Sequence, residues 1–303
     1  MHSMLLRHPY GLCQGGARSE TARMDSSVTH LSPREKMPFT GEAVVVYLDI
    51  LGFRRMDDSP HFPDGQRDAI RALRLLVPAA TDYPAVRADF YSFADSIVRV
   101  LSLESSEGKD RDTFRRYHMQ WALNAQDELL KKGLLVQGGV AEGRIFSNPA
   151  EDMVFGQALS RAYKLASEDA YFPRVAVAPS IAEANRDFPW LMKWRDDTWF
   201  IDYLRPPGIR WVGECTVTNM PYLTKRLEPH KTAVRSYVAG VTNHKELARC
   251  AWLVLYHNLN VNAVLWSRCA TATKEEEEVR SRLQGCLIQT DDLLVSKEAP
   301  VKP

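Results

Sequence analysis

The chain has 303 residues, of which 45% are hydrophobic and 25% are charged. This composition is that of an ordinary globular protein, and it excludes collagen-like, disordered and disulfide-scaffold classes. Lysine and arginine total 39 against 38 aspartate and glutamate residues, so the formal net charge is +1. No overall field draws the protein to nucleic acid or to an anionic membrane, and an anionic ligand therefore needs a local binding device.

Cysteine spacing and hydropathy give the expected compartment. The five cysteines contain no CxxC pair, which is typical of reduced thiols in a cytosolic protein. The longest apolar stretch, residues 251–256, is far shorter than the roughly 20 residues of a membrane span. The N-terminus lacks the continuous apolar segment of a signal peptide. We therefore expect a cytoplasmic protein without direct membrane insertion and without nucleic acid as a partner.

The first half of the chain alternates between short β-branched runs and helical patterns. Residues 1–40 show no periodicity and predict a flexible leader. A strand is then predicted from Glu42 and is closed by Gly52, and a helix is predicted at 64–77 with Asp64 as its N-cap. Two strands joined by a tight turn are predicted within 90–103. A helix at 111–132 ending at Gly133 and a strand at 134–142 follow. This β-α-β-β-α-β order is the split βαβ unit of ferredoxin-like folds.

The remainder turns from mixed to helical. A helix opening at Gly156 and strands at 174–178 and 199–204 complete the mixed region, which ends before the Pro-Pro-Gly sequence at 206–208. The helices predicted after it cover 231–238, 245–257 and 273–287. We therefore predict an α+β fold in three parts: a leader (1–40), an α+β domain (41–205) and a helical C-terminal extension (206–303).

Two aspartates stand where this topology brings strands together. Asp49 lies at the end of the first strand, and Asp95 lies at the turn between the second and third. The first and third strands of a ferredoxin-like unit are adjacent, so the two carboxylates should lie side by side at one sheet edge. Carboxylates this close repel each other unless a proton or a metal neutralises them. The alternatives are a site for Mg²⁺ or Mn²⁺ with substrate phosphates, or two aspartates that each cap their own turn.

A glycine turn follows the first of these aspartates. It consists of Ile50, Leu51, Gly52 and Phe53. Backbone N–H groups at such a turn before a helix can form a concavity that binds an anion. Because the turn stands beside two carboxylates, the combination predicts a site for a metal-bound polyphosphate.

Four motifs in this order resemble class III nucleotidyl cyclases over residues 42–205. They are VVYLDILGF at 45–53, FADS at 93–96, GGVAEG at 138–143 and FGQAL at 155–159. The resemblance implies the ferredoxin-like βαββαβ domain of that family, with two Mg²⁺ or Mn²⁺ ions per site held by Asp49, Asp95 and the carbonyl of Ile50. It also implies a nucleoside triphosphate substrate and a head-to-tail homodimer in which both subunits share each active site.

By the same resemblance, the ribose 3′-hydroxyl attacks the α-phosphorus in line and pyrophosphate leaves. The family's transition-state asparagine falls on Ser160 and its arginine on Lys164, with Arg161 as another candidate. Lys193 or Arg195 would hold the terminal phosphates. Because the asparagine and the arginine are both replaced, a catalytically inert module that binds a nucleotide stays open as the competing class.

The positions that read the base in this family disfavour a purine. They fall on Tyr91 and Met153, which cannot reproduce the hydrogen bonds of adenylyl or guanylyl cyclases. Bulky residues there suit a smaller base, and in this respect the chain is similar to the pyrimidine cyclases of bacterial Pycsar antiphage systems; the other interpretation of both residues is core filling. The Pycsar resemblance implies that UTP, or alternatively CTP, becomes a cyclic nucleotide that activates a separately encoded effector. A diguanylate cyclase is set aside because its Gly-Gly-(Asp/Glu)-Glu-Phe turn is missing.

Overall fold

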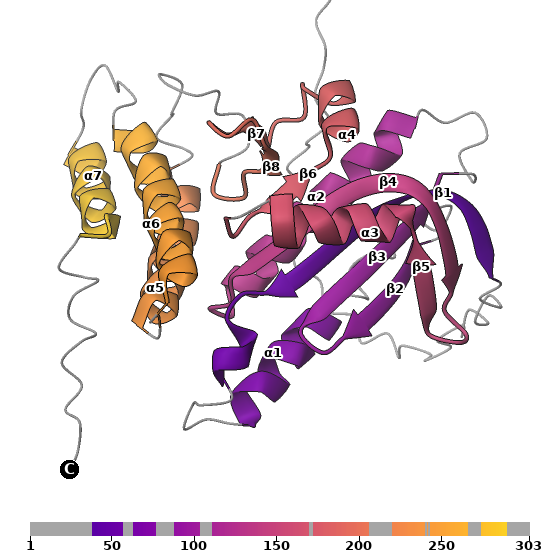
Figure 1. Ribbon diagram of the computed structural model, residues 1–303. Coiled ribbons are helices and arrows are strands. Elements are labelled where there is room, and N and C mark those ends of the chain that lie inside the picture. Colours follow the sequence, from indigo (N-terminus) through magenta and orange to yellow (C-terminus); the bar gives the residue numbers. More distant parts are fainter. Residues whose placement is uncertain are drawn as a thin grey trace, which may run out of the picture. The chain divides into compact units, whose positions relative to one another are not determined.

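A mixed sheet lies at the centre of the computed structural model (Figure 1). Within the described part of the chain the fold is α+β, as the sequence predicts. The predicted leader up to residue 37 and the predicted break at 206–208 lie outside that part. The structure describes residues 38–56, 63–76, 88–103, 111–169, 172–205, 220–239, 241, 243–265 and 274–289.

The strands follow the ferredoxin-like order and then extend it. They are β1 (Phe39–Ile50), β2 (Ala88–Phe93), β3 (Ser96–Ser102), β4 (Val136–Asn148), β5 (Met153–Gly156), β6 (Val175–Val177), β7 (Leu191–Lys193) and β8 (Trp199–Ile201). Central β1 pairs antiparallel with β3 on one side and with β4 on the other, and β2 lies beyond β3. The spatial order β2-β3-β1-β4 confirms the predicted split βαβ unit. Past β4 come β6, which is parallel to it, then β8 and β7, while β5 folds back on the end of β4.

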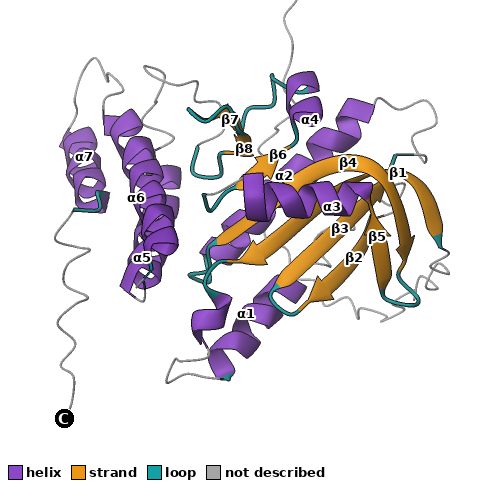
Figure 2. Cartoon of the chain, viewed as in Figure 1, coloured by secondary structure: helices purple, strands orange, loops and turns teal. Residues whose placement is uncertain are grey.

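The helices divide between the sheet region and the C-terminal third, as Figure 2 shows. Those of the sheet region are α1 (Asp64–Arg74), α2 (Arg111–Leu130), α3 (Gln157–Lys164) and α4 (Pro179–Ala184), with a 3₁₀ turn at Phe53–Met56 and a π-helical continuation of α3 at Leu165–Asp169. Those of the C-terminal third are α5 (Met220–Ala239), α6 (His244–Leu265) and α7 (Lys274–Cys286). The predicted helical extension is confirmed for the described residues.

The two faces of β1 belong to different hydrophobic clusters because successive side chains of a strand point to opposite faces. Val44 and Val46 pack in the cluster that contains residues of α1 and α2, whereas Val45 packs in the cluster that contains residues of α3. On the second face α3 crosses the sheet closely. A Cβ atom on Gly139 of β4 would lie 2.1 Å from the carbonyl oxygen of Ala162, so the glycine is what admits the helix.

Several predicted boundaries were wrong. Asp64 is not an N-cap: it is the first residue of α1, Pro63 precedes it, and no side chain caps the helix. The predicted strand 134–142 continues to Asn148, because it pairs with β5 in a hairpin that the sequence analysis missed. The short elements α4 and β7 were also missed, and the predicted strand 199–204 ends at Ile201. By contrast, the predicted Gly133 is where the chain leaves α2: the helix proper ends at Leu130, and the turn after it closes at Gly133, whose φ of 74° permits the left-handed cap.

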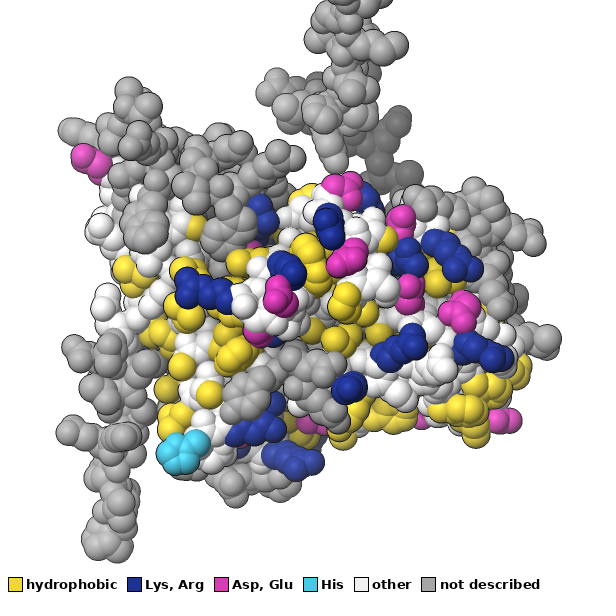
Figure 3. Space-filling model, turned by 45° about the horizontal axis from the view of Figure 1, so that its top comes forward, with side chains coloured by type: hydrophobic (Ala, Val, Ile, Leu, Met, Phe, Trp, Pro, Cys, Tyr) yellow, Lys and Arg dark blue, Asp and Glu magenta, His cyan; other side chains and the backbone are white. Residues whose placement is uncertain are grey.

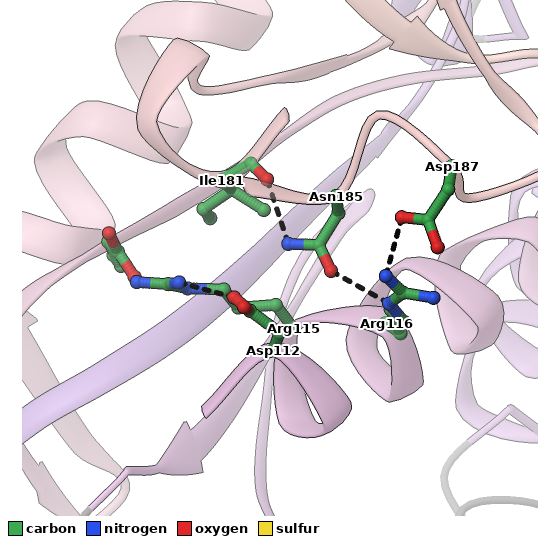
Figure 4. A network of polar contacts seen from close by, with 7 residues as sticks. Asp112, Arg115, Arg116, Ile181, Asn185 and Asp187 are labelled. Carbon is green, nitrogen blue, oxygen red and sulfur yellow. Dashed lines mark hydrogen bonds and ion pairs between the residues drawn. The ribbon is translucent and has the colours of Figure 1, made fainter. Parts of the chain in front are cut away.

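Polar contacts fix the N-terminal turn of α2 to the rest of the sheet domain (Figure 4). Arg115 pairs with Asp112 of the same helix at 2.6 Å and with Glu142 of β4 at 2.7 Å. The neighbouring Arg116 donates to Asn185 at 3.0 Å and pairs with Asp187 at 2.5 Å, both just after α4. This network links α2 to β4 and to the segment after α4, beside the apolar contacts that both helices make in the core.

The C-terminal helices pack against the sheet domain through buried side chains. An ion pair of 2.8 Å joins Arg226 of α5 to Asp127 of α2. The Tyr256 hydroxyl of α6 donates to the buried Asp202 carboxylate, just after β8, at 2.5 Å. The division of the chain at 205–206 stays a prediction. None of the described helices is both long and apolar enough to cross a bilayer.

Charges are mixed on the surface, in agreement with the near-neutral composition. On the face drawn in Figure 3, basic and acidic side chains of the described residues are interspersed and are not separated by sign. A polyphosphate would therefore depend on a few local groups, as the sequence analysis predicts.

Candidate active site

The two predicted aspartates lie next to each other where β1 ends. Asp49 stands opposite Ser96 in the antiparallel register of β1 and β3. The amide of Ile50 donates to the backbone carbonyl of Asp95 at 3.0 Å. Asp95 occupies the tight β2–β3 turn, which Ala94 enters in the left-handed region with φ of 47°. The predicted juxtaposition of these two residues is therefore present in the fold.

Two side chains hold the Asp49 carboxylate. The Ser96 hydroxyl donates to one carboxylate oxygen at 2.8 Å, and the Gln137 amide of β4 donates to the other at 3.0 Å. Because the Ser96 hydrogen is committed to Asp49, the Tyr47 hydroxyl must be the donor in its 2.9 Å bond to Ser96. A relay from Tyr47 through Ser96 therefore orients the carboxylate.

The local electrostatics favour a cation at this edge. Burial raises the pKa of the Asp49 carboxyl, the hydrogen bonds from Ser96 and Gln137 lower it, and the neighbouring Asp95 raises it again. Burial also raises the pKa of Tyr47 to about 12, so this hydroxyl stays protonated as a donor. The ionised form of Asp49 is thus under-stabilised by the protein alone, and a nearby positive charge would offset that deficit.

The donor set suits a hard divalent cation. Asp49 and Asp95 supply carboxylate oxygens, and the Gln137 side-chain oxygen beside them is buried with no hydrogen-bond partner in the described part of the chain. Mg²⁺ and Mn²⁺ prefer such oxygens and complete their shells with waters and substrate phosphates. No three histidine, cysteine, aspartate or glutamate side chains converge among the described residues. A cation here would therefore rely on two carboxylates and on its substrate, which is the usual arrangement for Mg²⁺.

The glycine turn after Asp49 offers fewer free amides than predicted. The amides of Ile50 and Leu51 already donate to the carbonyls of Asp95 and Leu135, and the Leu51 side chain is buried. Gly52 has φ of 76°, a conformation that favours glycine, and it opens the 3₁₀ turn by accepting from the Arg55 amide. In this turn, the backbone amides of Gly52 and Phe53 are thus the ones that can still donate to an anion.

The predicted catalytic side chains of α3 are exposed. Ser160, Arg161 and Lys164 all reach solvent, and Arg161 also donates to the backbone carbonyl of Glu142 at 3.0 Å. The last turn of α3 lies over β1, because the ring of Tyr163 meets the ring of Tyr47 edge-on at 5.5 Å. This end of the helix is therefore about two strand residues, or about 7 Å, from Asp49 along β1.

The predicted base-reading residues lie in different environments. Tyr91 of β2 is 1% exposed, and its hydroxyl donates to Ser147 at 2.7 Å, which in turn donates to Asp89 at 2.6 Å. Met153 of β5 is 43% exposed and stands opposite Asn148 of β4. The burial of Tyr91 fits the core-filling alternative, whereas Met153 is available to a ligand. A base contact by either residue stays a prediction.

The predicted phosphate-binding lysine lies far from the aspartates of its own chain. Lys193 belongs to β7, four strand positions from β1 in the sheet, which amounts to about 19 Å at the usual strand spacing. Its ammonium pairs with Asp197 at 2.8 Å and lies over the ring of Trp199. Arg195 is exposed in the turn between β7 and β8. The fold therefore does not bring either residue to Asp49 within one subunit.

Four residues around Asp49 were not predicted. Tyr47 had a detectable signal, because it stands two positions before Asp49 and so shares its face of β1. Ser96 directly follows Asp95, but its bond to Asp49 depends on the β1–β3 register. Gln137 depends on the β4 register in the same way. Arg249 of α6, whose charge acts on Asp49, comes from the C-terminal extension and has no signal in the sequence.

Comparison with known proteins gives remote structural similarities. None of the known protein-family models matches the chain, and no curated protein matches it. The guanylyl cyclase domain of the RhoGC fusion protein from Blastocladiella emersonii is 12% identical with a TM-score of 0.40, over 55% of this chain and 97% of that one. The guanylyl cyclase Cya2 is 11% identical with a TM-score of 0.41, over 54% of this chain and 92% of that one. A class III adenylyl cyclase-like ATP-binding protein from Pseudomonas aeruginosa is 17% identical with a TM-score of 0.35, and the match covers 55% of this chain and 39% of that one. Similarities this remote assign neither a substrate nor a mechanism to this chain.

Proposed function

We propose that this protein is a nucleotide cyclase that converts UTP to 3′,5′-cyclic UMP and pyrophosphate. The observation that carries the proposal is the pairing of Asp49 and Asp95 where β1 ends, directly before the Gly52 turn. Such an edge can hold a divalent cation and the phosphates of a nucleotide together. The order of the four motifs in the sequence supports the same chemistry. The likeness to the Pycsar group, which rests on Tyr91 and Met153, supports a pyrimidine substrate, a role in antiviral defence and an effector activated by the product.

The side chains have separate tasks in this reaction. Asp49, Asp95 and the Ile50 carbonyl would hold two Mg²⁺ or Mn²⁺ ions, which when bound supply positive charge to the triphosphate and lower the pKa of the ribose 3′-hydroxyl. Ser96 and Gln137 fix the two oxygens of Asp49 so that the carboxylate keeps one orientation. The amides of Gly52 and Phe53 bind phosphate oxygens. The 3′-hydroxyl then attacks the α-phosphorus in line, its proton is lost to solvent, and pyrophosphate departs.

The exposed end of α3 supplies the charge that stabilises the transition state. Lys164 or Arg161 neutralises the negative charge that develops on the transferred phosphoryl group, and Ser160 donates a hydrogen bond to it. These side chains are solvent-exposed within one subunit, which is what a site completed by a second subunit requires. The proposal therefore includes a head-to-tail homodimer with two shared sites.

A product assay tests the reaction. The purified protein is incubated with Mn²⁺ and each of the four ribonucleoside triphosphates, and the products are identified by mass. Cyclic UMP that disappears in Asp49→Ala is the expected result. Cyclic CMP alone would replace UTP with CTP as the substrate, and an ATP-only product would overturn the pyrimidine proposal. The absence of any product would favour the inert nucleotide-binding regulator, whose specific support is Ser160 and Lys164 in place of asparagine and arginine.

Mixing two inactive variants tests the shared site. Asp49→Ala lacks a metal-holding carboxylate, and the double variant Lys164→Ala/Arg161→Ala lacks the charges of α3. If each site draws these groups from different subunits, mixed dimers contain one intact site, so roughly a quarter of the wild-type activity should return. The measurement is cyclic nucleotide formed by the mixture against each variant alone. Failure of the mixture to exceed the single variants, with exchange of subunits verified by mass, would exclude shared sites.

A further inference from the structure

A cavity of about 360 Å³ lies where the turn that follows Asp49 meets the C-terminal helices. Its walls come from the turn at 51–56, from residues 133–135 that lead into β4, and from α5 at Ala233 and Tyr237. Proteins bind small organic molecules in cavities of about 300–1,000 Å³ that are mostly apolar and carry a few polar groups. The cavity is therefore large enough for a small organic ligand.

The cavity and the Asp49 carboxylate lie on opposite faces at the end of β1. The cavity residues Leu51, Leu135 and Tyr237 belong to the hydrophobic cluster that contains residues of α1 and α2. Tyr47, which shares the face of Asp49, packs against the other cluster, on the side of α3. The cavity is therefore separate from the candidate active site, and the two share the turn between them.

Arg55 is the one charged side chain among the described residues that line the cavity. Its Nη1 atom donates to the Tyr237 carbonyl at 2.9 Å, and its guanidinium lies over the Tyr237 ring at 4.0 Å. Glu246 of α6 is 3.9 Å away, which is too far for a hydrogen bond. The Nε atom is buried without a hydrogen-bond partner in the described part of the chain. These contacts leave the guanidinium incompletely satisfied, and an anion in the cavity would complete its set of partners.

Two other cavities of the described region are less suited to an anion. One beside α1 is lined by Asp68 and Arg71, whose charged groups are 3.6 Å apart. The other, between α5 and α7, is lined by Glu228 and Arg282, whose charged groups are 3.9 Å apart. Each of these has an acidic side chain in its wall, which repels an anion. No acidic side chain stands among the described residues that line the cavity at Arg55.

We infer that this cavity binds a small organic carboxylate, whose apolar body packs on Leu51 and Leu135 and whose carboxylate pairs with Arg55. The planar fork of the guanidinium matches the two oxygens of such a group. Occupancy would act on the turn beside the active site, because Arg55 rests against it. A Cβ atom on Gly52 would lie 2.7 Å from Nη2 of Arg55 and 3.1 Å from the ring of Tyr237. The ligand is thereby linked both to the turn and to α5.

Calorimetry with 2-naphthoate tests the site, and 2-naphthamide is a neutral probe with the same rings. The wild type is expected to bind 2-naphthoate at least about tenfold more tightly than the amide, because only the carboxylate pairs with Arg55. Arg55→Met should lose this preference and bind both probes alike. Arg55→Lys keeps the charge but loses the fork, so its preference should lie between the two. Bound 2-naphthoate should also slow amide hydrogen exchange in residues 51–56 and 233–237, which locates the site.

Arg54→Met is the matched control, since Arg54 is an exposed residue of the same 3₁₀ turn and does not line the cavity. It should bind 2-naphthoate within about twofold of the wild type. Ala233→Met fills the cavity from α5 and leaves Arg55 in place, so it should abolish binding of both probes even if Arg55→Met does not fold.

Four results would overturn the assignment. They are a wild type that binds no 2-naphthoate at millimolar concentration, a wild type that binds both probes alike, equal losses in Arg54→Met and Arg55→Met, and wild-type binding by Ala233→Met. Because the experiment contains no nucleotide, its failure would leave the proposed cyclase function untouched.

Discussion

Replacing Asp49 with asparagine is expected to abolish nucleotide cyclisation and to raise the thermal unfolding midpoint of the protein. The loss of activity follows from the removal of a negative charge that would hold the divalent cation, and it should be about a thousandfold or more, equal to about 4 kcal/mol of activation free energy. The gain in stability follows from burial, which raises the pKa of this carboxyl and so disfavours its ionised form in the folded state.

The surroundings of Asp49 can accept an asparagine with no more buried groups unpaired than in the wild type. The Ser96 hydroxyl can donate to the asparagine oxygen as it does to the carboxylate. Gln137 now donates to Asp49 through its nitrogen, while its own oxygen has no partner within the described chain. Rotation of the Gln137 amide by half a turn would place that oxygen against the new asparagine NH₂ group. The substitution therefore changes the charge and little else.

Asp187→Asn serves as the control for this pair of effects. Asp187 is exposed, and its pKa is lowered by the hydrogen bond and ion pair with Arg116, opposite in direction to that of Asp49. The same chemical change there should leave cyclase activity intact and should not raise the unfolding midpoint. Cyclase assays and thermal melts on the wild type, Asp49→Asn and Asp187→Asn measure both effects. An Asp49→Asn protein that keeps a tenth of the activity would contradict the metal-holding role, and one that melts below the wild type would contradict the destabilising effect of burying the carboxylate.

The aspartate pair was predictable because its position depends on a local pattern and one topological rule. The β-branched run of β1 closed by Gly52, and the interruption at Ala94, fix where both strands end, and the ferredoxin-like order makes those ends neighbours. By contrast, the partners of Asp49 depend on register across the sheet. Gln137 lies within the predicted strand 134–142, but only the register in which β4 pairs with β1 sets it opposite Asp49.

The contribution of the extension could not be predicted for a different reason. Helical spacing locates α6, but it does not show which of its faces meets another part of the chain. Tyr237, which packs on Gly52, is 185 positions from it, and Arg249, whose charge acts on Asp49, is 200 positions from that aspartate. Long-range packing between a helix and a loop leaves no periodic trace in the sequence.

Stability is expected to fall steeply between about pH 6.5 and pH 5, because three histidines are buried in neutral form. His118 and His230 are fully buried, and desolvation lowers the pKa of each well below 6.5. Desolvation also lowers the pKa of His257 to about 4. In the unfolded chain these histidines take up protons below about pH 6.5, whereas in the folded protein they do not. Each therefore costs about 1.4 kcal/mol of unfolding free energy per pH unit in this window.

Hydrogen bonds explain why His230 and His257 resist protonation. His257 donates through Nε2 to the Cys286 carbonyl at 2.8 Å, so its Nδ1 accepts from Nδ1 of His230 at 2.9 Å. A proton added to His257 Nδ1 would face the N–H of His230, and Lys231 next to it also disfavours the positive charge. In the same way, His118 Nδ1 is bound to the guanidinium of Arg99 at 3.0 Å.

One buried carboxyl opposes this trend. Burial raises the pKa of Asp202 to about 6, against the lowering effect of the bond from Tyr256. Between about pH 6 and pH 4 the folded protein thus carries a proton that the unfolded chain lacks, which stabilises the fold as the pH falls. The stabilisation from Asp202 offsets the destabilisation from roughly one of the three histidines. The unfolding free energy should therefore fall by about 3 kcal/mol per pH unit near pH 5.

Urea unfolding at a series of pH values between about 7 and 5 measures this slope. His257→Gln can keep the donor to the Cys286 carbonyl and removes one titrating group, so its slope should be shallower by about 1.4 kcal/mol per pH unit. His244→Gln changes an exposed histidine of the same helix and should leave the slope unchanged. A wild-type stability that is flat across this range, or an equal effect of the two variants, would show that the buried histidines do not govern the acid response. The expected outcome instead makes the histidine pair between α5 and α6 a main source of acid sensitivity in the C-terminal extension.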